Sequence, residues 1–137
     1  MKNFSGPLED RLLIRELFGT YCDSVFQGDV EAWLTNWADE GIWILFNKEI
    51  RGKIELRAQW EKLWSTLNKM MFFTEIGSIE INGERALARS YCREIMHWHD
   101  GSIQKVVGMY EDELIRENGE WLFIQRHYKL LADEGRA

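Results

Sequence analysis

The C-terminal half of the chain, from residue 71 to residue 131, reads MFFTEIGSIEINGERALARSYCREIMHWHDGSIQKVVGMYEDELIRENGEWLFIQRHYKLL. Three dipeptides divide it, Asn82-Gly83, Asp100-Gly101 and Asn118-Gly119. Asn-Gly and Asp-Gly favour the tight turns that join antiparallel strands, because both residues tolerate a positive φ. The runs between these turns are rich in branched and aromatic side chains, as strands are. The pattern predicts an antiparallel meander of four long strands, over residues 71–81, 85–98, 103–116 and 120–131.

In the chain before this meander, the apolar residues have the spacing typical of helices. Apolar side chains recur every three or four positions within residues 8–27, which predicts an amphipathic helix. Gly28 ends this helix, and the next residue is an aspartate suited to cap a short second helix. That second helix is predicted to present Trp33 and Trp37 one turn apart.

Two short strands and a third helix complete the predicted elements. Residues 42–46 are aromatic and branched, which predicts a strand. After a turn, residues 50–51 are predicted to form a second strand beside it. Residues 54–67 carry apolar side chains on one helical face. Helices first and sheet later is an α+β order rather than βαβ alternation. Residues 132–137 are expected to be a frayed tail.

The predicted meander has consequences for shape and assembly. A sheet this long must twist and coil, and curled around a helix it forms a cone with one open mouth, where small molecules bind. The last strand is apolar on both faces, with Trp121 and Phe123 on one and Leu122, Ile124 and Tyr128 on the other. Helices cover one face only, which predicts a homodimer through the other.

Composition narrows the class of protein. The 137 residues are 45% hydrophobic and 29% charged, which fits one globular domain over residues 1–137. The net charge of −6 and the lack of a basic run disfavour nucleic acid as a partner. No apolar run approaches the ~20 residues that span a bilayer, and residues 1–10 lack the apolar segment of a secretory signal. Cys22 and Cys92 are too few for a disulfide framework, so a cytoplasmic protein with two reduced thiols is expected.

Aromatic residues are the unusual part of the composition. The sequence has seven Trp, seven Phe and four Tyr. Such rings bury large areas, so they fit either a packed core or the lining of an apolar pocket. The two interpretations are compatible, and the sequence leaves both open.

Several local strings resemble one known superfamily. They are GDVEAW at residues 28–33, WADEG at 37–41, GMYEDEL at 108–114 and NGEW at 118–121, followed by Arg126. Together they resemble the NTF2-like superfamily and, within it, the SnoaL-like branch, over about residues 8–130. The resemblance implies an α+β cone, in which three N-terminal helices pack in a curved mixed or antiparallel sheet around an apolar pocket.

The same resemblance implies proton-transfer chemistry, with a departure at the usual residues. The branch includes dehydratases, dehydrochlorinases, polyketide cyclases and the β subunits of ring-hydroxylating dioxygenases, and many members use an Asp–His pair as general base. In the dehydratase-like members an Asp lies five residues after the position that Tyr21 matches, and here that residue is Phe26. The partner His comes from the segment matching residues 67–75, which contains no His.

Candidate site residues follow from the resemblance and from strand alternation. Tyr21 is the candidate hydrogen-bond donor and His127 the candidate acid or base. Alternate strand residues point to opposite faces, so one of Arg126 and His127 faces the cavity. Arg126 is expected to pair with a carboxylate such as Asp112. The predicted pocket lining is Phe26, Trp37, Trp43, Trp60, Trp64, Met71, Tyr110 and Arg126.

Other titratable residues are expected to lie in solvent. His97 and His99 lie near a hairpin turn without a third metal ligand, so no metal site is predicted, and no cofactor motif is present. Asp23 is expected to be a solvated helix carboxylate. Glu75 and Glu94 lie on strands, where either could be buried with a raised pKa, but both are expected on the surface.

The sequence therefore leaves three functions open. The first is a SnoaL-like lyase or isomerase that acts on a small hydrophobic ring compound by proton transfer. The second is a binding domain with the same pocket and no turnover, which the missing Asp–His pair favours. The third is an interaction subunit similar to a dioxygenase β subunit.

Overall fold

The computed structural model describes residues 3–137, which form one mixed sheet and three helices. The strands lie in the order β1-β4-β5-β6-β7-β2-β3. β1 pairs with β4 and β2 with β7 in parallel, and all other neighbours are antiparallel. The predicted α+β class with a mixed sheet is confirmed. The elements are β1 (Phe4–Ser5), α1 (Leu8–Gln27), α2 (Val30–Leu34), β2 (Trp37–Leu45), β3 (Lys48–Arg51), α3 (Gly52–Trp64), β4 (Leu67–Asn82), β5 (Arg85–Trp98), β6 (Ile103–Glu117) and β7 (Glu120–Arg136).

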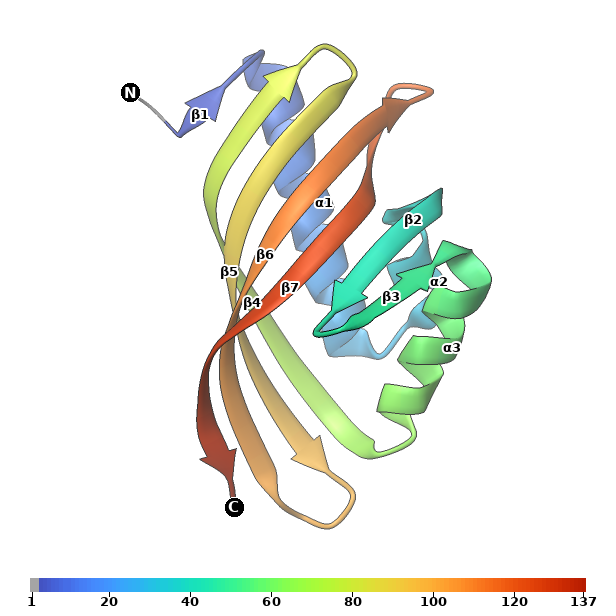
Figure 1. Ribbon diagram of the computed structural model, residues 1–137, viewed down its shortest axis with the longest axis vertical. Coiled ribbons are helices and arrows are strands. Elements are labelled where there is room, and N and C mark those ends of the chain that lie inside the picture. The colour runs from blue at the N-terminus through green and yellow to red at the C-terminus, as the bar shows by residue number, and fades with distance from the viewer. Residues whose placement is uncertain (1–2) are drawn as a thin grey trace.

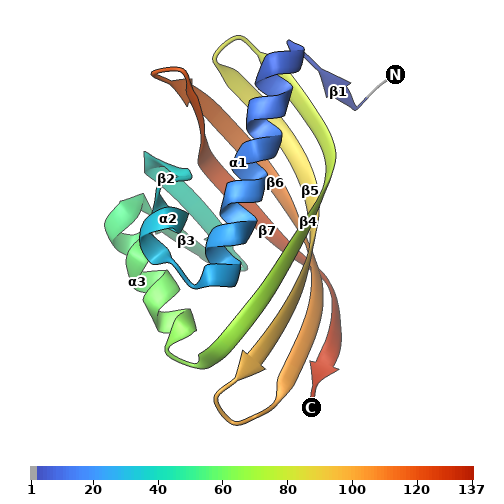
Figure 2. The same cartoon turned by 180° about the vertical axis from the view of Figure 1, so that it is seen from behind.

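The helices lie on one side of a strongly curved sheet. α1 runs along the inner face of β4–β7, and α2 and α3 lie next to β2 and β3 (Figures 1 and 2). The other face of the long strands carries no helix of the described chain (Figure 1). None of the helices within residues 3–137 is both long and apolar enough to cross a membrane.

One face of helix α1 packs against the concave side of the curved sheet. Its buried residues include Ile14, Phe18, Tyr21 and Val25, which follow the predicted periodicity. The rings of Phe18 and Tyr21 lie 5.2 and 5.6 Å from the ring of Phe123 on β7. The helix stops where Gly28 takes the left-handed conformation that other residues adopt with strain. Apolar packing between α1 and β7 therefore fixes the position of Tyr21.

A β-bulge in β7 changes which of its residues face inward. Leu114 pairs with Phe123 but Glu113 pairs with Gln125, so Ile124 is an extra residue without a partner. Trp121 and Phe123, which share a face as predicted, are buried before the bulge, and Arg126 and Tyr128 are buried after it. The prediction that Tyr128 shares a face with Leu122 and Ile124 is wrong, because the bulge shifts the two-residue period.

Two predicted boundaries near the aromatic residues are wrong. α2 ends at Leu34, and Trp37 begins β2 instead of ending the helix. The Asn36 side-chain amide donates to the backbone carbonyls of Ala32 and Trp33. The backbone carbonyl of Asn36 accepts from the backbone N–H of Phe123 on β7. These bonds end the helix and join the chain to the sheet.

The ends of the long strands also differ from the prediction. α3 ends at Trp64, so β4 begins at Leu67. The predicted frayed tail is wrong, because β7 continues to Arg136. There Arg136 bonds to Asp100 at 3.0 Å and to the hydroxyl of Ser102 at 2.8 Å. These side-chain contacts hold the end of the chain against the β5–β6 hairpin.

Candidate functional site

A small aromatic cavity lies between the helices and the inner face of the sheet. Its volume is about 50 Å³. Four tryptophans and two tyrosines line it, and Glu94 is the one acidic residue among its lining side chains in residues 3–137. The lining residues are Tyr21, Val25, Trp33, Trp43, Trp60, Leu63, Trp64, Met70, Phe72, Glu94 and Tyr110.

The walls of the cavity are tryptophans supplied by α2, β2 and α3. The Trp33 ring lies 5.4 Å from that of Trp43 and 4.8 Å from that of Trp60. Trp60 and Trp64 are one helical turn apart on α3, and their rings stack at 5.4 Å. Trp37 lies behind this wall, 5.7 Å from Trp33. Flat apolar walls of this kind suit the faces of a planar ring.

Glu94 reaches the cavity from the inner face of β5. One of its oxygens, Oε2, accepts a hydrogen bond from the hydroxyl of Tyr128 at 2.6 Å. The thiol of Cys92 lies 3.8 Å from the same oxygen. Burial raises the pKa of Glu94, and the bonds from Tyr128 and Cys92 and the charge of Arg126 only partly oppose it. A carboxylate with a raised pKa is a stronger base than an ordinary glutamate.

Two phenols face the cavity beside this carboxylate. The Tyr110 hydroxyl accepts from the indole Nε1 of Trp43 at 3.1 Å. Tyr21 lies next to Trp33 and Arg126, which can only donate. Burial raises the pKa of both phenols, so both keep their protons. Because these neighbours offer no acceptor, the hydroxyl protons are free for a ligand oxygen in the cavity.

A buried ion pair, Arg126 with Asp112, packs against the rings of the two phenols on the side away from the cavity. Arg126 Nε and Nη2 donate to the two oxygens of Asp112 at 2.8 and 3.0 Å, and both side chains are 0% exposed. The guanidinium lies 3.9 Å from the centre of the Tyr110 ring and 4.5 Å from that of Tyr21. Burial disfavours its charge, but the charge of Asp112 and the hydrogen bonds to it oppose this effect, and the pKa of Arg126 is raised. The pairing of Arg126 with Asp112 is as predicted.

The structure places the predicted site and lining residues in different positions. Tyr21, Trp43, Trp60, Trp64 and Tyr110 line the cavity, whereas Trp37 and Arg126 lie one layer behind it.

Phe26 and Met71 do not line the cavity. Phe26 is 41% exposed and packs on Phe73, with ring centres 5.2 Å apart. A residue five positions after Tyr21 lies about 140° around the helix, since each residue turns about 100°. Met71 points to the outer face of β4, and its neighbours Met70 and Phe72 point inward. The strand phase predicted there was shifted by one residue.

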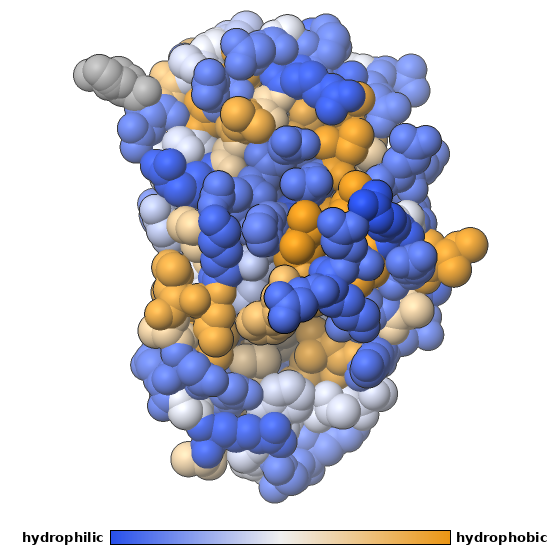
Figure 3. Space-filling model, viewed as in Figure 1, coloured by the Kyte–Doolittle hydropathy of each residue, from blue (hydrophilic) through white to orange (hydrophobic). Residues whose placement is uncertain are grey.

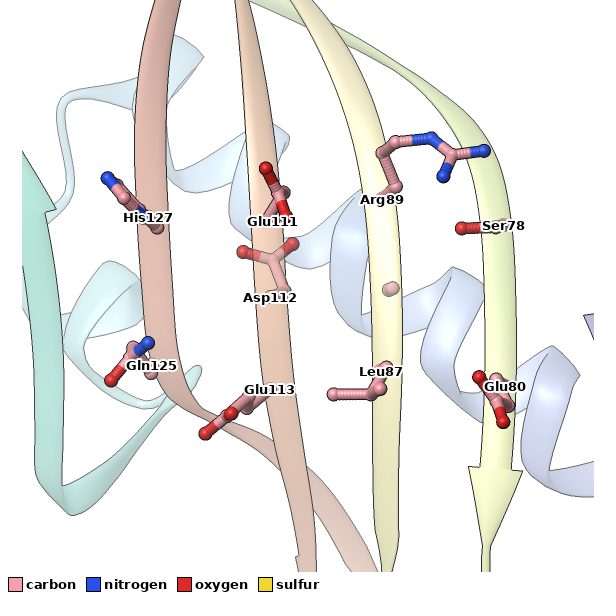
Figure 4. Close-up of a pocket in the computed structure, with 10 residues that line it drawn as sticks. Ser78, Glu80, Leu87, Arg89, Glu111, Asp112, Glu113, Gln125 and His127 are labelled. Carbon is pink, nitrogen blue, oxygen red and sulfur yellow. The ribbon is translucent and has the colours of Figure 1, made fainter.

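His127 lies on the wrong side of the sheet for the predicted role. Because Arg126 is buried inside, the next residue points outward. His127 lines a depression of the outer face, of about 350 Å³, together with Arg89, Glu111 and Gln125 (Figure 4). Tyr21 and His127 are therefore not brought together in one site.

Glu94 is the cavity residue that the sequence prediction did not select. It was expected on the surface, but the even-numbered residues of β5 from Ala86 to Met96 form the inner face of the sheet. The sequence pattern that indicates this phase is an alternation in size. Small side chains at 86, 88, 90 and 92 alternate with Leu87, Arg89 and Tyr91. Asp23, as expected, is exposed. Within residues 3–137 no three His, Cys, Asp or Glu side chains are placed to hold a metal ion.

The chain matches the SnoaL-like domain family over residues 6–127, and it belongs to that family. The motif-based prediction is confirmed. No curated protein matches the sequence.

Solved structures share the fold at low sequence identity. An aromatic ring hydroxylase-like protein from Novosphingobium aromaticivorans is 20% identical, with a TM-score of 0.88, over 97% of this chain and 95% of its own. A scytalone dehydratase-like protein from the same organism is 15% identical, with a TM-score of 0.85, over 92% and 87%. A hexachlorocyclohexane dehydrochlorinase, LinA type 2, is 14% identical, with a TM-score of 0.83, over 92% and 88%. At these identities the likeness shows the fold.

Proposed function

We propose that this protein is a lyase or isomerase that moves a proton next to a carbonyl group on a small planar ring compound. Glu94 is the general base, and Tyr21 and Tyr110 donate hydrogen bonds to the carbonyl oxygen. The observation that carries the proposal is the position of Glu94, a carboxylate with a raised pKa among the aromatic walls of the cavity.

The chemistry follows from the charges that form during proton removal. When the Glu94 carboxylate takes a proton from carbon, the electron pair of the C–H bond shifts toward the carbonyl and charge develops on its oxygen. Phenol donors aimed at that oxygen stabilise the charge in a water-poor site. If a carbon–carbon double bond is conjugated with the enolate, the protonated Glu94 returns the proton at the far end of that bond, as in an isomerase. If a leaving group lies β to the carbonyl, the electron pair expels it and the protonated Glu94 can give it the proton, as in a lyase.

A ring ligand requires the cavity to widen. An apolar cavity of roughly 150 Å³ accommodates benzene, and this one has about 50 Å³. Trp64 is the last residue of α3 and is only partly buried, so it is the wall residue that can move at least cost. We propose that Trp64 swings aside when the ring enters.

The test is turnover of a panel of small cyclic ketones, some with a leaving group β to the carbonyl and some with a β,γ carbon–carbon double bond. We expect kcat/KM for the accepted compounds to rise with pH, because the base must be ionised. The midpoint is expected above 4.5, the ordinary pKa of a glutamate side chain, since burial raises that of Glu94. Stopped assays that follow product by absorbance from pH 4 to pH 9 measure it. A flat profile, or no turnover of any panel member, would refute the proposal.

The second candidate is a binding domain without turnover. It is favoured by the small cavity and by the lack of a histidine among the lining residues. Tryptophan fluorescence distinguishes the two, because four tryptophans surround the cavity. Quenching by a ketone that is not converted would support the binding domain.

We also propose a homodimer through the outer face of the sheet. Tyr91 and Ile95 on β5 and Val107 and Met109 on β6 point outward there, and Tyr91 is cross-strand from Met109. Apolar side chains are visible on this uncovered face (Figure 3). Sedimentation velocity at micromolar concentration should give a dimer, and Val107→Asp should convert it to a monomer. A wild-type monomer would contradict the proposal.

A further inference from the structure

We propose that Tyr128 is a positioning residue that holds one oxygen of Glu94 and leaves the other free to accept the proton. The inference rests on the proposed role of Glu94. The Tyr128 hydroxyl donates to Oε2 at 2.6 Å. Oε1 accepts no hydrogen bond from any side chain or backbone group within residues 3–137. The hydrogen bond therefore fixes the carboxylate rotamer and selects Oε1 as the reactive atom.

The Tyr128 ring is itself held in place by its surroundings. It lies directly on the backbone of Gly108, where a Cβ would approach the ring Cζ and the hydroxyl oxygen to 2.7 Å. Real Cβ atoms essentially never come so close, so any other residue at 108 must displace the ring. The ring of Tyr110 lies 5.2 Å away and that of Phe46 5.9 Å away, both edge-on. Gly108 is thus the position that allows Tyr128 to reach Glu94.

The groups facing Glu94 make Tyr128 its principal donor. From its own strand only the Cys92 thiol is near, at 3.8 Å, and thiols are weak donors. Arg126 acts through its charge from β7, and the Tyr21 and Tyr110 phenols share the cavity. α3 and β4 contribute apolar lining residues only, Trp60, Leu63, Trp64, Met70 and Phe72. Burial, and then the charge of Glu94, raise the pKa of Tyr128, so it stays a donor.

Tyr128 therefore changes the pKa of Glu94 as well as fixing the orientation of its carboxylate. A hydrogen bond to the charged form of a carboxylate favours that form. The bond from Tyr128 therefore lowers the pKa of Glu94 and opposes the effect of burial. Without it, Glu94 would be protonated over more of the pH range and its carboxyl group would be free to rotate.

The test is Tyr128→Phe, read by carbon-13 NMR titration of the glutamate side chains and by the pH profile of kcat/KM. We expect the Glu94 titration to move to higher pH. On the rising limb of the wild-type profile, kcat/KM should fall by roughly 10- to 100-fold, as for loss of a hydrogen bond to a charged group. A residue needed only for packing would leave the Glu94 titration unchanged. Thr20→Val, which removes an exposed hydroxyl on α1 outside the cavity lining, is the control and should change neither readout.

Gly108→Ala provides an independent second variant. It keeps the Tyr128 hydroxyl but pushes its ring, so the Glu94 titration should shift in the same direction. Gly19→Ala is its control, because a Cβ there meets nothing within 4 Å. An unshifted Glu94 titration in Tyr128→Phe would overturn the inference. A shifted titration in a protein that turns over no substrate would overturn the proposed function and leave the hydrogen bond from Tyr128 to Glu94 established.

Discussion

Replacing Glu94 with glutamine is expected to lower kcat by about 10²–10⁴-fold, the usual contribution of a positioned general base. Glutamine has nearly the same shape, and its carbonyl oxygen can still accept the hydrogen bond from Tyr128. What it loses is the ability to take a proton. The ligand should therefore still bind, with KM changed little, and the rising limb of the pH profile should disappear. Steady-state kinetics on the best ketone of the panel measure both effects.

The stability of the same variant shows whether a lost rate reflects lost chemistry or a lost fold. The pKa of Glu94 is higher in the folded protein than in the unfolded chain. Its favourable contribution to folding is therefore present in acid and is lost as pH rises through the folded pKa. Glutamine cannot ionise, so the variant should match or exceed the wild-type free energy of unfolding at pH 8, with the advantage shrinking toward pH 4. Urea unfolding at the two pH values measures this.

A matched control is Glu61→Gln, an exposed carboxylate on α3 that lies outside the cavity lining. It should leave kcat, the pH profile and the stability difference between pH 8 and pH 4 unchanged. If Glu94→Gln keeps more than a third of the wild-type kcat, Glu94 is not the base.

The architecture could be predicted from the sequence because short-range signals specify it. Asn82-Gly83, Asp100-Gly101 and Asn118-Gly119 mark the hairpins that separate β4, β5, β6 and β7. Each of these dipeptides acts within two residues, so no long-range contact is needed to interpret it. The end of β7 could not be predicted in this way. It depends on Arg136 reaching Asp100 across the sheet.

The site was harder to predict, since it depends on strand phase at single positions. The bulge at Ile124 carries no turn residue, and it moves Tyr128 from the predicted outer face to the inner one. The same kind of error placed Met71 inside in place of Met70. Glu94 was assigned to the surface because charged residues seldom point inward. The exception arises where a tyrosine from another strand supplies a hydrogen bond, which only the folded chain shows.

Removing one partner of the buried ion pair is expected to give the largest loss of stability. Asp112→Ala should lower the free energy of unfolding by about 3–5 kcal/mol, because it leaves the Arg126 cation buried without its partner. The Arg126 side chain cannot become neutral by losing its proton, because arginine stays protonated in proteins and the pKa of Arg126 is already raised. The rings of Tyr110 and Tyr21 compensate only in part, since each cation–π contact contributes about 0.5–2 kcal/mol.

Removing the other partner, in Arg126→Met, should lower the free energy of unfolding by less than Asp112→Ala does. Burial already raises the pKa of Asp112, so without Arg126 its carboxyl can take up a proton and become neutral. The double variant Asp112→Ala with Arg126→Met removes both charges and should recover much of the loss from Asp112→Ala, because apolar residues often replace a buried pair at little cost. A double-mutant cycle from urea unfolding at pH 7 measures the difference.

The exposed pair of Arg51 and Glu49 is the control for these variants, since both side chains are more than half exposed. Glu49→Ala should change stability by less than about 1 kcal/mol, as is usual for a solvated ion pair. If Asp112→Ala costs no more than Glu49→Ala, water must reach Arg126. In that case the phenols would lose the dry, charged support on which their role as donors to a ligand depends.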